Sequence, residues 1–153
     1  MQLEVTFGVA IDEYGIVYEW GRGNLKPHII TRPGQKVINV SAGFDQIAYV
    51  TSKGNVFGDG TILNGTLNGI NNAVKVEVTE NSLIILTSDG KVHEYKNGSL
   101  TDIQITPRVI DISANATSVM YQTVDEEVYV SGTNTYGQLG IRTKQYIYSS
   151  KSK

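Results

Sequence analysis

Few residues in this sequence are of the types that carry out catalysis. The chain has two histidines, His28 and His93, and no cysteine. Side-chain catalysis usually needs a nucleophile beside a base, paired carboxylates or a metal cluster. His93 lies in a strand-like stretch where related segments of the chain carry Tyr or Phe, so we expect it to pack there. His28 follows Pro27 on an expected outer strand and is expected to be solvated. The sequence therefore predicts a protein that is not an enzyme.

Acidic residues also fail to form a recognisable metal site. Asp125, Glu126 and Glu127 form the one acidic run, which falls in an expected hairpin turn. Asp59 lies in Gly58-Asp59-Gly60, which resembles a calcium loop only in composition, because it lacks the repeated oxygen ligands of such loops. Thiolate sites are excluded by the absence of cysteine. We predict no metal and no cofactor.

Aromatic and basic residues near the ends of expected strands are better suited to recognition. Trp and Arg contribute strongly to many protein interfaces, because one buries a large area and the other makes forked hydrogen bonds. The predicted binding residues are Trp20, Arg22, Tyr95 and Tyr136. Trp20 aligns with Asp59, Tyr95 and Ser131 in the repeats described next. This variation suits an exposed face that is used for recognition, and it also suits ordinary surface.

The elements that position these residues come from an internal repeat. Four expected turns can be superimposed, and their last residues are Gly15, Gly54, Gly90 and Glu126, at steps of 39, 36 and 36 residues. Two positions after each of them stands a valine: Val17, Val56, Val92 and Val128. A period of 20–50 residues is typical of solenoids and propellers, and about 36 residues suits a four-stranded blade.

The segments around these turns read as strands. They are rich in Val, Ile, Thr and Tyr, alternate between apolar and polar residues, and are interrupted by many of the 16 glycines. Further strands are expected at the apolar pairs that begin at Val37, Ala73 and Val109. We predict an all-β fold, a β-propeller or a propeller-like arc of four short blades. It is expected to be a single domain over 1–153, with repeats at about 1–36, 37–73, 74–108 and 109–153.

One repeat resembles a known family. Residues 109–113 read Val-Ile-Asp-Ile-Ser, and residues 132–140 follow the pattern Gly-x-Asn-x-x-Gly-Gln-Leu-Gly. Together they are similar to a repeat of the regulator of chromosome condensation family, and eroded versions occur at 15–21 and 37–44. The resemblance implies a β-propeller in which the motif residues are mostly structural. The repeats here are fewer and shorter than in typical members, and we see no counterpart of the family's nucleotide-exchange activity.

Net charge and hydropathy limit the classes of partner that the protein can bind. The formal net charge of −2 and the pI of about 5.6 provide no basic surface for phosphates, so we predict no nucleic-acid binding. No apolar run approaches the roughly 20 residues of a membrane-spanning helix, and Glu4 interrupts the start of the chain where a signal peptide would be apolar. We therefore expect no membrane insertion and a cytoplasmic or virion-associated protein.

The leading hypothesis is a protein interaction or assembly module. Its partner is another protein or a second copy of the chain, because an open arc of blades exposes sheet edges that proteins usually pair or cover. One form of this hypothesis is a structural component of a viral or phage particle. The segment 145–148 could be the fourth strand of the last blade or a strand offered to another blade. The alternative function is a carbohydrate-binding, lectin-like propeller, and an enzyme is the third hypothesis.

Overall fold

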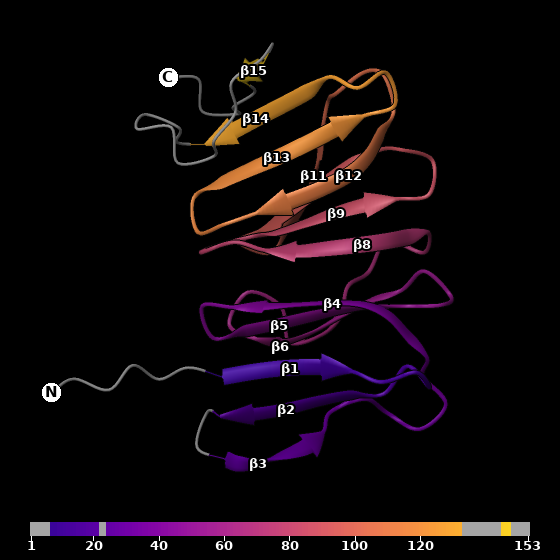
Figure 1. The fold of residues 1–153 in the computed structure, drawn as a ribbon, viewed down its shortest axis with the longest axis vertical. Coiled ribbons are helices and arrows are strands. Elements are labelled where there is room, and N and C mark those ends of the chain that lie inside the picture. Colours follow the sequence, from indigo (N-terminus) through magenta and orange to yellow (C-terminus); the bar gives the residue numbers. More distant parts are fainter. Residues whose placement is uncertain (1–6, 22–23, 133–144, 148–153) are drawn as a thin grey trace, which may run out of the picture.

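The computed structural model describes residues 7–21, 24–132 and 145–147, and these form strands and turns with no helix. The strands make four small sheets that follow one another in chain order along the longest axis of the molecule (Figure 1). The first sheet lies at the bottom of this view and the last at the top, so the sheets form an open arc. This confirms the prediction of an all-β, propeller-like arc of four short blades. In the described ranges there is no helix of the length and hydropathy that membrane crossing requires.

Each sheet is one blade. Blade 1 contains β1 (Phe7–Ile11), β2 (Val17–Gly21) and β3 (Asn24–Ile29). Blade 2 contains β4 (Val37–Gly43), β5 (Gln46–Thr51), β6 (Val56–Gly60) and β7 (Gly65–Thr66). Blade 3 contains β8 (Ala73–Val78), β9 (Leu83–Thr87), β10 (Val92–Lys96) and β11 (Ser99–Ile103). Blade 4 contains β12 (Val109–Ala114), β13 (Ser118–Thr123), β14 (Val128–Gly132) and β15 (Gln145–Ile147). The limits of the domain and of its repeats stay a prediction.

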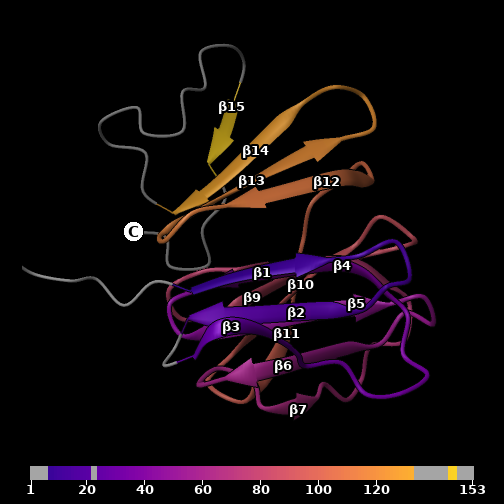
Figure 2. The ribbon, with the colours of Figure 1, turned by 60° about the horizontal axis from the view of Figure 1, so that its bottom comes forward.

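The last strand differs from the others in direction. Strands pair antiparallel with their neighbours in blades 1 to 3, whereas β15 pairs parallel with β14. Figure 2 shows β15 beside β14 at the edge of blade 4. Of the two alternatives left open by the sequence, β15 therefore takes the fourth-strand place in its own blade.

The repeated turns sit between the two central strands of each blade. In each turn the last residue donates its N–H to a carbonyl three residues back and has a positive φ: +80° at Gly15, +84° at Gly54, +81° at Gly90 and +70° at Glu126. Glycine adopts this conformation without steric cost. The four turns that can be aligned in the sequence are therefore hydrogen-bonded hairpin turns.

The turn glycines also join each blade to the next. Gly15, Gly54 and Gly90 accept a hydrogen bond from the first residue of β4, β8 and β12, with N···O distances of 2.9, 3.0 and 3.0 Å. A Cβ added at Gly54 would lie 2.3 Å from the carbonyl oxygen of Asn71. Glycine is therefore required here for the close approach of the next blade as well as for φ.

The core lies between the blades. The largest cluster joins blades 2 and 3 and contains eleven buried residues: Ala48, Val50, Val56, Leu63, Leu67, Ile70, Ala73, Val76, Val78, Leu83 and Ile85. Blades 3 and 4 share seven: Ile84, Leu86, Val92, Val109, Ile112, Val119 and Tyr121. Blades 1 and 2 share only three: Val17, Val37 and Tyr49. The contact between blades 1 and 2 is the thinnest of the three.

The repeated valine belongs to these cores. It is the first residue of β2, β6, β10 and β14, and it is buried in the first three blades. Val128 in blade 4 is only half-buried. Val17, Val56 and Val92 each pack in the cluster shared with the following blade, and no described blade follows blade 4. The repeated valine is therefore a core residue in three of the four blades.

Candidate functional site: a cleft between blades 1 and 2

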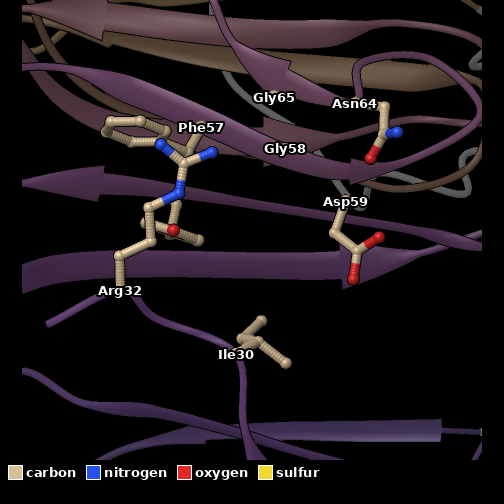
Figure 3. A pocket seen from close by; sticks show the side chains of 8 residues that line it. Ile30, Arg32, Phe57, Gly58, Asp59, Asn64 and Gly65 are labelled. Atoms are coloured by element: carbon tan, nitrogen blue, oxygen red, sulfur yellow. The ribbon is translucent and has the colours of Figure 1, made fainter.

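A cleft of about 260 Å³ lies where blades 1 and 2 meet (Figure 3). It is lined by residues of both blades: Ile30, Arg32, Tyr49, Phe57, Gly58, Asp59, Asn64 and Gly65. The backbone before β4 supplies Ile30 and Arg32, and blade 2 supplies the rest. In Figure 3 the Arg32 side chain rises toward Phe57, and the Asp59 and Asn64 side chains lie together at the other side of the cleft. A cation, a carboxylate and an amide therefore share one hollow.

Arg32 is held by a tight turn. Gln35 donates its N–H to the carbonyl oxygen of Arg32 at 3.1 Å, Pro33 stands at the second position, and Gly34 has a φ of +85°. These are the features of a type II turn. The Gln35 Oε1 accepts two hydrogen bonds of 2.9 Å, from the Arg32 N–H and from the Tyr49 hydroxyl. One glutamine thus fixes the turn to blade 2 and positions the backbone of Arg32.

Two aromatic rings form one wall of the cleft. Tyr49 and Phe57 are cross-strand partners on β5 and β6, and their rings stack with centroids 5.5 Å apart and an interplanar angle of 21°. The Arg32 guanidinium lies over the Phe57 ring, with Cζ 5.7 Å from the centroid. Such contacts contribute about 0.5–1 kcal/mol at exposed sites. The aromatic wall therefore orients the arginine.

A second glutamine positions the opposite side. Gln46 is fully buried, and its Oε1 accepts hydrogen bonds from the N–H groups of Ile62 and Leu63 at 2.7 and 3.0 Å. Its Nε2 donates to the Leu63 carbonyl oxygen at 2.9 Å. These bonds fold residues 61–64 back onto β5, next to the two residues Asp59 and Asn64 that face the cleft. The Gly58-Asp59-Gly60 segment is the end of strand β6, and Gly58 lies close to Leu63 in this loop.

Charges in the cleft are not neutralised by each other. Within residues 7–21, 24–132 and 145–147, neither Arg32 nor Asp59 forms a hydrogen bond through its side chain or an ion pair with another side chain. The pKa of the Tyr49 hydroxyl is raised, mainly by burial and also by the Asp59 carboxylate, whereas Arg32 and the hydrogen bond to Gln35 lower it. Tyr49 consequently stays protonated and keeps donating to Gln35 at neutral pH.

Solved structures resemble this arrangement of blades. Human WBSCR16 superimposes with a TM-score of 0.77 at 19% identity, over 94% of this chain and 49% of that one. Prp20p from Saccharomyces cerevisiae gives a TM-score of 0.70 at 17% identity, over 91% of this chain and 44% of that one. Yeast RCC1 (Prp20) bound to Kap60 gives a TM-score of 0.69 at 16% identity, over 84% of this chain and 40% of that one. The chain has the RCC1-like repeat fold.

This RCC1-like chain spans half or less of the length of the three solved structures. No protein-family model matches its sequence, and neither does any curated protein. At such low identity the resemblance defines the fold, and the function has to be inferred from the site.

The RCC1-like fold places the predicted binding residues apart from one another. Trp20 is 38% exposed on β2, and its ring covers Gly8 on β1, where an added Cβ would lie 2.4 Å from the ring. Tyr95 is half-buried on β10 and packs against the core between blades 2 and 3. Arg22 and Tyr136 lie outside the described residues. The role of these four in binding stays a prediction.

The remaining chemistry-bearing residues have structural surroundings. His93 is half-buried, with Nδ1 2.8 Å from an Asp102 carboxylate oxygen, and His28 Nε2 lies 3.4 Å from a Glu19 oxygen. Glu126 lies in the turn, as expected for the acidic run. No group of three or more His, Asp or Glu side chains in the described part of the chain is placed to hold a metal ion.

Sequence reasoning did not select the residues of the cleft. The repeat register aligns Asp59 with Trp20 and Tyr95 at a variable position. In the structure this position faces the preceding blade, so the alignment is the signal that could have identified Asp59. The dipeptide Pro33-Gly34 after Arg32 was a second local signal, since it predicts a turn. Chemically, the cleft can form charge-assisted hydrogen bonds with a ligand through Arg32 and Asp59.

Proposed function

We propose that this protein is a non-catalytic protein interaction module that binds an extended segment of a partner protein in the cleft between blades 1 and 2. The observation that carries the proposal is a cleft that holds Arg32, on the turn fixed by Gln35, and Asp59, beside the loop fixed by Gln46, and neither side chain has a partner in the described part of the chain. Binding sites typically combine an apolar wall with a few fixed polar groups. Here the Tyr49–Phe57 pair is the wall, and Arg32, Asp59 and Asn64 are the polar groups.

The solved structures support a protein partner. One of them is yeast RCC1 (Prp20) bound to Kap60, and another reports binding of Prp20p to Gsp1p and histones. These partners belong to those proteins. What carries over to this chain is the proposal that an RCC1-like arc presents its blade edges and clefts to other proteins.

A carbohydrate ligand has less support in this cleft. Sugar binding between blades uses free aromatic faces, whereas Phe57 is stacked on one side by Tyr49 and contacted by Arg32. Self-association and a place in a viral or phage particle stay predictions from the sequence. The molecular mass of the purified protein in solution tests self-association.

Selection of peptides tests the proposed function. Random linear peptides displayed on phage are selected against the immobilised protein and then measured against Arg32→Gln and Asp59→Asn. Lys53→Gln and Glu13→Gln are matched controls, because both residues are exposed in turns outside the cleft. We expect the selected peptides to lose affinity for the two cleft variants only. Equal affinity for all four variants would show that the cleft is not the binding surface.

A further inference from the structure

The charges of the cleft specify what kind of segment it accepts. Some charged side chains of the protein have internal partners: Lys75 Nζ lies 2.6 Å from an Asp111 oxygen, and Asp12 accepts hydrogen bonds from the N–H groups of Tyr14 and Ile16. Arg32 and Asp59 lack such partners in the described part of the chain. Burying part of a carboxylate without a partner is unfavourable. A ligand that supplies both opposite charges removes this cost.

The orientation of Arg32 determines which group it binds. Its Cζ lies over the Phe57 ring, and its side-chain N–H groups have no hydrogen-bond partner in the described part of the chain. The guanidinium edge matches a carboxylate, which it can bind through two parallel hydrogen bonds. On the other side of the cleft, the Asp59 carboxylate accepts from an ammonium or guanidinium group. Asn64 offers both a donor and an acceptor to a peptide group.

The pleat of an extended chain limits the spacing of the two charges of the ligand. In an extended chain, side chains two residues apart point the same way and are separated by about 7 Å. Two side chains at this spacing can both enter the cleft, whereas adjacent ones point to opposite sides of the peptide.

We propose that the cleft recognises an extended segment with an acidic and a basic side chain two residues apart, the acidic one on Arg32 and the basic one on Asp59. This inference rests on the proposed function, since it names the chemistry of the segment bound there. It implies a preference for charge order along the peptide. Because Arg32 is exposed, it also implies that affinity falls as salt is added.

Position-specific enrichment in the same random peptide library tests the inference. Wild-type protein should enrich an acidic residue at one position and a basic residue two positions away. Arg32→Gln should lose only the acidic preference, and Asp59→Asn only the basic one. Each change should weaken binding of the selected peptides by about three- to tenfold. The double variant Arg32→Glu with Asp59→Lys should enrich the same pair in reversed order.

The outcomes separate this inference from the function on which it rests. If cleft-dependent peptides are enriched without a charged pair, or if the double variant keeps the wild-type order, the charge rule is wrong and the interaction module stands. If no enriched peptide depends on the cleft, both proposals fail. Far-ultraviolet circular dichroism and melting of each variant, with Lys53→Gln and Glu13→Gln alongside, separate a loss of binding from a loss of fold.

Discussion

The contact between blades 1 and 2 differs from that between blades 2 and 3, although both use the same repeat positions. The latter is a closed apolar core of eleven buried residues, and the former has three buried residues and an open cleft. At the fourth position of the third strand, blade 3 carries Tyr95 and blade 2 carries Asp59. Tyr95 packs against the core, whereas Asp59 leaves a hollow with a charge in it.

The repeat position that Tyr95 fills in blade 3 faces the preceding blade, so a large side chain there adds packing that Asp59 does not supply in blade 2. Under the proposed function, stability and recognition compete for this position in blade 2. Four changes test this comparison.

The largest effect is expected from truncating the closed core. Ile85 is fully buried between blades 2 and 3, so Ile85→Ala should cost about 2–5 kcal/mol of the free energy of unfolding. Ile30 is half-buried beside the cleft, so Ile30→Ala should cost about 1 kcal/mol. Urea unfolding measures both. Similar costs for the two variants would mean that the two interfaces are equally tight.

The next effect concerns the glutamine that builds the cleft. Gln46→Ser introduces the residue that blades 3 and 4 carry at this position, Ser82 and Ser118, and leaves the Ile62 and Leu63 N–H groups without their acceptor. We expect a loss of about 1–3 kcal/mol and faster hydrogen exchange at these two amides. Gln35→Ser is the control, because it loosens the Arg32 turn and should leave both amides protected.

A smaller effect is expected from closing the cleft. Asp59→Tyr places the blade 3 residue in blade 2, removes a carboxylate that has no partner in the described part of the chain, and fills part of the hollow. We expect a gain of up to about 1 kcal/mol together with loss of peptide binding. Thermal melting and the phage-selected peptides give the two readouts. A variant that is clearly destabilised would show that Tyr95 fits its site for reasons beyond the repeat position.

The smallest effect distinguishes the hairpin of blade 1 from those of the other blades. The pKa of Asp12 is lowered by the hydrogen bonds that it accepts, above all by the one from the Ile16 N–H. At the equivalent position of the turn, blade 2 carries Thr51, which has no carboxylate. Because folding lowers this pKa, the Asp12 carboxylate stabilises the folded state at pH values above the ordinary carboxyl pKa. This stabilisation is lost as the pH falls through the lowered pKa. Asp12→Asn should therefore reduce the drop in melting temperature between neutral pH and pH about 3. An unchanged drop would contradict this assignment.

Local patterns predicted most of the fold. The hairpins and their register follow from turn residues and strand alternation, which depend on neighbouring residues only. The apolar pairs at 37–38, 73–74 and 109–110 were less informative, because a register irregularity turns the second member outward, and Ile38, Val74 and Ile110 are 48%, 39% and 47% exposed. The parallel direction of β15 had no local signal, because it depends on pairing between distant segments.

The candidate site was only partly accessible from the sequence. The register identified the position of Asp59 but ranked Trp20 and Tyr95 above it, since aromatic residues are common in interfaces. The role of Gln46 could not be predicted, because its hydrogen bonds reach residues 16 and 17 positions away and exist only in the folded blade. Arg32 gains its place from a contact between blades, which the sequence of either blade alone does not contain.

Glu126 affects how copies of the chain can add to one another. It has a φ of +70°, like the glycines of the other three turns, but it carries a side chain where those glycines contact the first strand of the following blade. Identical units that stack head to tail without closing grow into filaments. At the equivalent Gly54 an added Cβ would lie 2.3 Å from the Asn71 carbonyl oxygen. A side chain at this turn of blade 4 therefore disfavours the addition of a further unit through the same backbone contact.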